Sequence, residues 1–254
     1  MNTYTKKEMM VISAARMITD SDIVFCGTGI SMLAAVAAKH IYAPDATIFF
    51  ETGAIDSELA HLPLAVSDSR VMTGAGAFCS LVEAFSFMQN KKTSARIVGI
   101  IGAAQIDAYG NLNSTMIGDY GDVKTRFPGS GGACDLASFV NTILAFMKLE
   151  KRKFVEQLDY LTSPGWRPMG KSREACGLRP QGPKAVITDM GIMKFDATTH
   201  RMYLDQYYPG VTPDDIRDRT GFDLDISRAV EAEPPAENAL TILRTRTDPE
   251  CLIL

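Results

Sequence analysis

The sequence predicts an α/β fold with an open, mostly parallel sheet, flanking helices and an appended antiparallel portion. In the first hundred residues, short apolar runs alternate with segments of helical pattern, which is typical of βαβ units. The run 46–50 is almost wholly apolar and rich in β-branched and aromatic residues, as in a strand buried on both faces. The second half is less regular, and the segment 192–207 indicates two antiparallel strands around a polar turn.

Each element of the first half has a local signature. Thr5 and Glu8 form a capping box ahead of apolar residues at helical spacing, which predicts the first helix. The run 22–26 reads as a strand, and the alanine-rich segment 32–41 predicts a closely packed helix. The other elements expected here are a strand over 46–50, a helix over 81–90 and a strand over 95–101.

The second half contains turn-rich connections at 163–166 and 179–183. We expect a strand over 185–188 and a polar turn at 196–199 between the two antiparallel strands. A proline at the first turn predicts a short helix at 212–215, and a last helix is expected near 236–246. No linker is long or polar enough to divide the chain, so we expect a single domain over 1–254.

Composition excludes several classes of function. With a net charge of −4 and no run of basic residues, the chain lacks the electrostatic signature of nucleic-acid binding. It has no long apolar stretch, and its first eight residues are polar, so we expect a cytoplasmic protein without membrane span or signal peptide. The five cysteines form no C-x-x-C pair, and the three histidines are far apart. We therefore expect reduced thiols and no metal site.

Glu51 is the most informative residue, because it follows the buried run 46–50 and precedes Gly53. Ligands and reactive groups cluster beyond the carboxyl ends of strands in open parallel sheets. A charged side chain at the end of an apolar strand costs free energy unless it is paired or used. Glu51 is thus a candidate nucleophile, and the structural alternative is a capping or salt-bridged glutamate.

Several glycine-bearing loops could surround a ligand. Gly27-Thr28-Gly29 follows a strand, but Met32 takes the place of the third glycine of a dinucleotide motif, so a nicotinamide site is disfavoured. The polar loop 102–119 follows another strand. Gly129-Ser130-Gly131-Gly132-Ala133 precedes a helix start and can turn its amides outward, which suits phosphate or a developing oxyanion. Either loop could also be a structural turn.

In combination, Glu51-Thr52-Gly53, the block 102–114 and the loop 129–133 resemble the signature of family I coenzyme A transferases. The likeness is greatest to the smaller (B) subunits of the glutaconate group and covers nearly the whole chain. Thr52 stands where the family pattern has Ser or Asn, a conservative departure. Further matching segments are 42–45, 117–120, 162–166, 194–196, 207–209 and 220–225.

The resemblance implies ping-pong transfer of CoA from an acyl-CoA to a carboxylic acid through a glutamyl-CoA thioester on Glu51. It implies an oxyanion or CoA-binding loop at Gly129, Gly131, Gly132 and Ala133. Coenzyme A would be a substrate, with no permanently bound cofactor, and a separate A-type subunit would complete the enzyme. The other candidate pocket residues are Gly27, Gly29, Gln105, Asp107, Asn111 and Asn113.

Three alternatives stay open at this point. Relatives on the same fold act as acyl-CoA decarboxylases or hydrolases, but those considered have lost the glutamate that matches Glu51. A 3-oxoadipate CoA-transferase subunit would share the same motifs. A ligand-sensing module without chemistry would need neither a strand-end glutamate nor a glycine-rich amide loop.

Overall fold

The computed structural model describes residues 4–59 and 61–254, so the first three residues of the polar N-terminal stretch lie outside it. The chain divides into two compact units, residues 1–101 with 234–254 and residues 102–233. We expected a single domain over 1–254. That the two units fold together as one domain stays a prediction.

The first unit is built on three parallel strands. β1 (Ile23–Cys26) pairs in parallel with both β2 (Thr47–Phe49) and β5 (Ile97–Gly102). β3 (Ala54–Ile55) and β4 (Ala77–Phe78) extend the sheet beyond β2 as short antiparallel strands. All three predicted strands of this half are confirmed, and their apolar side chains form the core of the unit.

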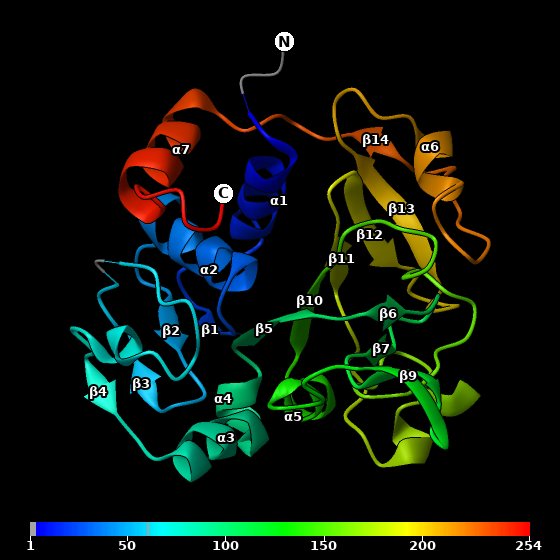
Figure 1. Cartoon of the computed structure of the whole chain (residues 1–254), viewed down its shortest axis with the longest axis horizontal. Coiled ribbons are helices and arrows are strands. Elements are labelled where there is room, and N and C mark those ends of the chain that lie inside the picture. Colours follow the sequence, from blue (N-terminus) through cyan, green and yellow to red (C-terminus); the bar gives the residue numbers. More distant parts are fainter. Residues whose placement is uncertain (1–3, 60) are drawn as a thin grey trace. The chain divides into compact units, whose positions relative to one another are not determined.

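Three helices of the first unit pack together (Figure 1). α1 (Lys6–Ala15) begins at the predicted Thr5–Glu8 capping box. α2 (Ile30–Ile41) is buried over most of its length, and its alanines allow the close approach of α1. α7 (Glu237–Ile242) ends the fold and continues into a π-helical turn over 243–247. Two further helices are α3 (Leu81–Gln89) and α4 (Lys91–Ser94).

The second unit contains the appended antiparallel portion that the sequence predicts. β10 (Thr142–Phe146) pairs in parallel with β11 (Ala185–Ile187). β11, β12 (Gly191–Phe195) and β13 (Met202–Tyr207) are antiparallel neighbours, and β14 (Val230–Glu231) adds in parallel to β13. α6 (Pro213–Arg217) is the predicted short helix, with Thr212 as its cap.

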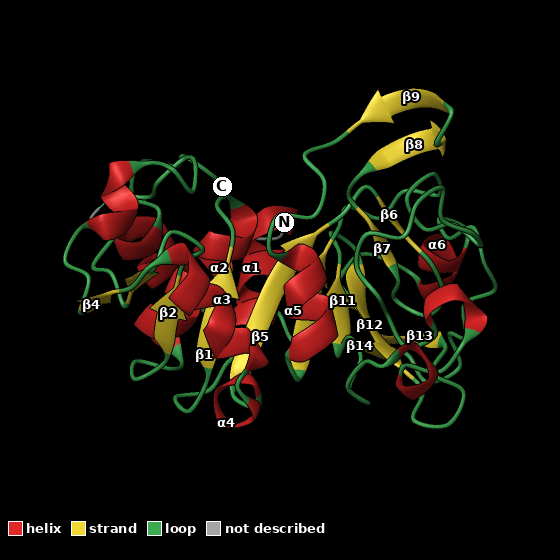
Figure 2. Ribbon diagram, turned by 90° about the horizontal axis from the view of Figure 1, so that it is seen from below, coloured by secondary structure: helices red, strands yellow, loops and turns green. Residues whose placement is uncertain are grey.

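Two small hairpins of the second unit were not predicted. β6 (Gln105–Ile106) pairs with β7 (Leu112–Asn113), and β8 (Met116–Asp119) pairs with β9 (Asp122–Arg126). The β8–β9 hairpin extends away from β6 and β7 (Figure 2). α5 (Ala133–Phe139) follows it, close to the helix start expected from the sequence.

Within the described residues, all five cysteines are free thiols. The same residues contain no group of three or more His, Cys, Asp or Glu side chains placed to hold a metal ion. A search of these residues also finds no helix of the length and apolarity needed to cross a membrane.

Candidate active site

Glu51 lies in a tight turn directly after β2. The Gly53 amide donates to the Phe50 carbonyl at 2.9 Å, and the Phe50 amide donates to the Ala54 carbonyl at 3.0 Å. The chain therefore reverses within four residues and returns as β3. β2 ends one residue earlier than predicted because Phe50 already belongs to this turn.

Gly53 is the residue that makes the turn possible. Its φ is 91°, in the region that favours glycine. A Cβ at Gly53 would lie 1.9 Å from the carbonyl oxygen of Cys79, whose amide donates to the Gly53 carbonyl at 2.9 Å. A side chain here would therefore displace the turn and Glu51 with it.

The Glu51 carboxylate has no internal partner. Glu51 is half-buried, and its side chain makes no hydrogen bond or ion pair with any residue that the structure describes. The alternative of a capping or salt-bridged glutamate thus finds no support among residues 4–59 and 61–254. A half-buried carboxylate kept without a partner is typical of a group reserved for a ligand.

Strand register places an open loop beside Glu51. Phe25 of β1 pairs directly with Phe49 of β2, so Gly27 and Glu51 both follow two residues beyond the paired carboxyl ends. A Cβ at Gly27 or Gly29 would meet no atom within 4 Å. Gly29 caps α2 without a side-chain hydrogen bond, which leaves the helix's first amides facing this edge of the sheet.

The glycine-rich loop lies in the second unit. Ser114 holds its start, since the Gly129 amide donates to the Ser114 carbonyl at 3.0 Å and the Ser114 hydroxyl donates to the Gly129 carbonyl at 2.8 Å. The Ala133 amide donates to the Ser130 carbonyl at 2.9 Å. The amides of Gly131 and Gly132 have no acceptor among the described residues, so these two, rather than Ala133, are available for an oxyanion.

Asp107 and Asn111 shape the β6–β7 turn. One Asp107 oxygen accepts from the Tyr109 amide at 2.9 Å and the Asn111 amide at 3.0 Å, and the other accepts from the Asn111 side chain at 2.7 Å. Burial raises the pKa of Asp107, although these hydrogen bonds oppose the rise. Both residues also line a hollow that includes Tyr109 and Arg167.

Gln105 and Asn113 join through their side chains. The Asn113 amide group donates to the Gln105 carbonyl oxygen at 2.7 Å and to the Met116 carbonyl at 2.6 Å. The Gln105 amide group donates to Asp159 at 3.2 Å. Local hydrogen bonds therefore account for both side chains, and their role in a substrate pocket stays a prediction.

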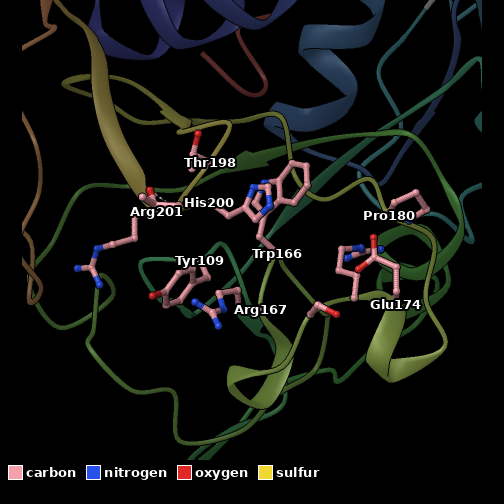
Figure 3. A pocket seen from close by; sticks show the side chains of 11 residues that line it. Tyr109, Trp166, Arg167, Glu174, Pro180, Thr198, His200 and Arg201 are labelled. Atoms are coloured by element: carbon pink, nitrogen blue, oxygen red, sulfur yellow. Dashed lines mark hydrogen bonds between the residues drawn. The ribbon is translucent and has the colours of Figure 1, made fainter.

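The structure also reveals a hollow that the sequence did not indicate. It has a volume of about 450 Å³ and combines three segments of the second unit (Figure 3). Because these segments are far apart in the chain, no local pattern could have connected them. We call this hollow the arginine pocket and define it by Tyr109, Trp166, Arg167, Arg173, His200 and Arg201.

Comparison with known proteins decides the family. The model of the family described as coenzyme A transferase matches residues 7–219. The B subunit of glutaconate CoA-transferase from Acidaminococcus fermentans is 45% identical over 97% of this chain and 93% of its own. The chain belongs to the coenzyme A transferase family.

Further similar proteins agree with this assignment. The B subunit of 3-oxoadipate CoA-transferase from Pseudomonas knackmussii is 35% identical over 96% of this chain and 94% of its own. The crystal structure of glutaconate coenzyme A-transferase from Acidaminococcus fermentans superposes with a TM-score of 0.94 and 43% identity, covering 99% of this chain and 97% of that chain. The structure of the decarboxylase AibA/AibB matches with a TM-score of 0.83 and 25% identity, covering 98% and 96%.

These comparisons confirm the resemblance drawn from the sequence and the predicted fold class. The chain is a CoA transferase, so coenzyme A is its substrate. The relatives are named as B subunits, which implies a partner subunit. The roles of Glu51 and of the glycine-rich loop of this coenzyme A transferase stay predictions.

Proposed function

We propose that this chain is the nucleophile-bearing subunit of a two-subunit enzyme that moves CoA from an acyl-CoA to a dicarboxylic acid such as glutaconate. The observation that carries the proposal is the half-buried Glu51 carboxylate, which has no partner among the described residues. It lies beside the open Gly27 loop at the carboxyl edge of β1 and β2, where ligands of open parallel sheets bind.

The chemistry begins with the Glu51 carboxylate, because a carboxylate, unlike a hydroxyl, attacks without a general base. A carboxylate oxygen attacks the thioester carbonyl of the acyl-CoA, and the C–S bond breaks to give a mixed anhydride and CoA thiolate. The thiolate then attacks the glutamyl carbonyl and releases the donor acid as its carboxylate. The resulting glutamyl-CoA thioester reacts with the acceptor carboxylate by the reverse sequence, which is ping-pong turnover.

A carboxylate is a weak nucleophile, so the tetrahedral oxyanions need stabilisation. In this proposal the amides of Gly131 and Gly132 supply it, since neither has an internal acceptor among the described residues. Removing one donor of this kind costs about 3 kcal/mol of transition-state stabilisation in other acyl-transfer enzymes. Binding of the distant CoA nucleotide can add energy for distortion at the thioester.

The proposed partner is a separate A-type subunit. Support comes from the relatives, which are B subunits of enzymes with named subunits and which this chain matches over almost its full length. The sequence contains no duplicated half that could replace the partner. The active site would then be shared between two polypeptides, in a cytoplasmic enzyme without a permanently bound cofactor.

Glutaconate is the proposed acceptor because the glutaconate relative is 45% identical, against 35% for the 3-oxoadipate relative. Decarboxylation is disfavoured because the nucleophilic glutamate that transfer requires is present as Glu51. A sensing module is disfavoured for the same reason, since it would gain nothing from a partly buried, unpaired carboxylate.

The test is to purify the chain alone and together with an A-type subunit, and to measure CoA transfer from acetyl-CoA to glutaconate and to 3-oxoadipate. We expect turnover only from the assembled enzyme, with kcat/KM higher for glutaconate by about tenfold or more. Full turnover by the chain alone would contradict the two-subunit assignment. A preference for 3-oxoadipate would overturn the choice of acid but not the mechanism.

A further inference from the structure

The arginine pocket concentrates positive charge, since arginines outnumber acidic residues in its described lining. Arg167 and Arg201 form no ion pair with any described residue. Among the described residues, the guanidinium groups of Arg167 and Arg201 make only long hydrogen bonds to carbonyls, at 3.5 Å to Gly170 and 3.4 Å to Asp223. Glu174 is the acidic side chain among the described lining residues, so three arginines face one carboxylate in a chain of net charge −4.

Arg173 provides a fixed part of this charge. It is 1% exposed, and its guanidinium donates to four carbonyls, those of Ala137, Pro164, Gly165 and Arg179, at 2.7 to 3.0 Å. Burial lowers its pKa to about 10, which still leaves it charged at neutral pH. Since these carbonyls hold the side chain in place, its charge is a permanent feature of the pocket wall.

Tyr109 holds the other two arginines at the pocket. The guanidinium carbon of Arg167 lies 5.6 Å from the centre of the tyrosine ring, and that of Arg201 lies 5.7 Å from it. Figure 3 shows the ring between the two side chains. These cation–π contacts position both guanidinium groups but use none of their N–H donors. The donors therefore remain available for a ligand.

The β12–β13 turn brings Arg201 and His200 to the pocket. Asp196 organises it by accepting from the amides of Thr198 and Thr199, at 3.0 and 2.9 Å. Asp196 is fixed in turn by an ion pair with Arg228. His200 has a φ of 57°, a conformation that costs a non-glycine residue free energy and that marks many ligand sites.

The aromatic wall restricts the class of ligand. The Trp166 ring stacks on His200 with the centroids 4.4 Å apart and the planes 4° apart. Gly182 lies so close to the same indole that a Cβ there would be 2.5 Å from it. Gly182 therefore covers the face of the indole opposite His200. Trp166 therefore has no open face for a nucleobase, and the Tyr109 ring lies between guanidinium groups. The pocket suits a compact anion rather than a nucleotide base.

We propose that the arginine pocket binds a small oxyanion, a phosphate or the carboxylate of a small acid, which accepts hydrogen bonds from Arg167 or Arg201 on one side of the Tyr109 ring, while the other arginine and the fixed Arg173 add positive charge. Guanidinium groups bind both kinds of oxyanion through paired N–H donors. The site is separate in its residues from Glu51 and the glycine-rich loop, and it does not depend on the proposed reaction.

The test is calorimetric titration of the full chain, in buffer free of phosphate and sulfate, with sodium phosphate and, separately, with sodium glutarate. Sodium chloride at equal ionic strength controls for general screening. We expect one phosphate or one glutarate to bind per chain. Whichever of the two anions binds shows whether the pocket takes a phosphate or a carboxylate. Arg167→Gln and Arg201→Gln should each weaken binding about tenfold or more, and the double variant should show none.

Arg219→Gln is the matched control, because Arg219 is exposed in the same unit and does not line the pocket. It should bind as tightly as wild type. Arg201→Lys keeps the charge but loses the paired donors, so its binding should fall between wild type and Arg201→Gln. Binding that survives the double variant with its fold intact, or no binding of either anion beyond chloride, would overturn the proposal.

Discussion

Phe25 and Phe49 are direct partners across β1 and β2, and their rings meet edge to face with centroids 5.0 Å apart. This pair fixes the register of the two strands at their carboxyl ends. Gly27 and Glu51 consequently emerge at matching positions on the same edge of the sheet.

The first prediction concerns the open space at Gly27. A Cβ here meets nothing within 4 Å, so Gly27→Val should change the free energy of unfolding by no more than about 0.5 kcal/mol. If substrate occupies this space, transfer by the assembled enzyme should fall about tenfold or more. Urea unfolding and steady-state turnover measure the two effects. Unchanged turnover in a folded Gly27→Val enzyme would place the substrate elsewhere.

The second prediction concerns Thr52, whose hydroxyl oxygen is buried and has no hydrogen-bond partner in the described chain. Thr52→Val removes this unsatisfied group, so the free energy of unfolding of the isolated chain should rise by about 1 kcal/mol. Thr52→Ser keeps the hydroxyl and serves as the control, and its free energy of unfolding should not rise. A destabilised Thr52→Val chain would mean that the hydroxyl has a partner in solution.

The third prediction concerns the glycine-rich loop. Gly132→Val should hinder close approach of a thioester to the Gly131 and Gly132 amides and lower kcat by about a hundredfold, with much less effect on CoA affinity. Gly121→Val is the control for the added side chain, because a Cβ at Gly121, at the tip of the β8–β9 hairpin, meets nothing within 4 Å. Wild-type kcat in folded Gly132→Val enzyme would remove this loop from the mechanism.

The fourth prediction concerns pH and His40, whose Nδ1 lies 3.0 Å from the Thr247 hydroxyl. Burial lowers the pKa of His40 to about 4 from 6.5, and Arg246 and Lys39 add to the shift. As the pH falls, His40 is therefore protonated in the unfolded chain before it is protonated in the folded chain. The stability that neutral His40 contributes is complete above pH 6.5 and declines as the pH falls toward 4.

Urea unfolding between pH 7.5 and about pH 5 measures this decline. His40→Gln should flatten it, whereas His61→Gln should retain it, because His61 is exposed and pairs with Glu250. Equal pH dependence of wild type and His40→Gln would show that His40 is not the group responsible.

The elements that the sequence predicted well are those with local signals. The Thr5–Glu8 capping box located the start of α1, and the polar turn at Asp196 located the β12–β13 connection. The turn around Glu51 was likewise visible, because Glu51 and Gly53 directly follow the apolar run 46–50. In each case the determining interaction lies within a few residues of the chain, which is where sequence patterns act.

The arginine pocket could not be predicted in this way, and neither could the hydrogen bonding of individual backbone amides. Tyr109, Trp166 and His200 meet only through the fold of the second unit. Ala133 was a predicted oxyanion donor, but whether its amide is free depends on the Ser130 carbonyl, a detail of loop conformation. The β8–β9 hairpin was missed because both strands are short and β9 is mostly polar.

The central claim is that Glu51 is the nucleophile, and the most direct measurement is to trap its thioester. The assembled enzyme is mixed with acyl-CoA without an acceptor acid, and mass spectrometry then locates bound CoA, or the borohydride-reduced glutamyl side chain. We predict the modification on the peptide that spans 48–54, and its loss together with all transfer in a folded Glu51→Ala enzyme. A modification on any other residue, or a Glu51→Ala enzyme that still transfers CoA, would contradict the account.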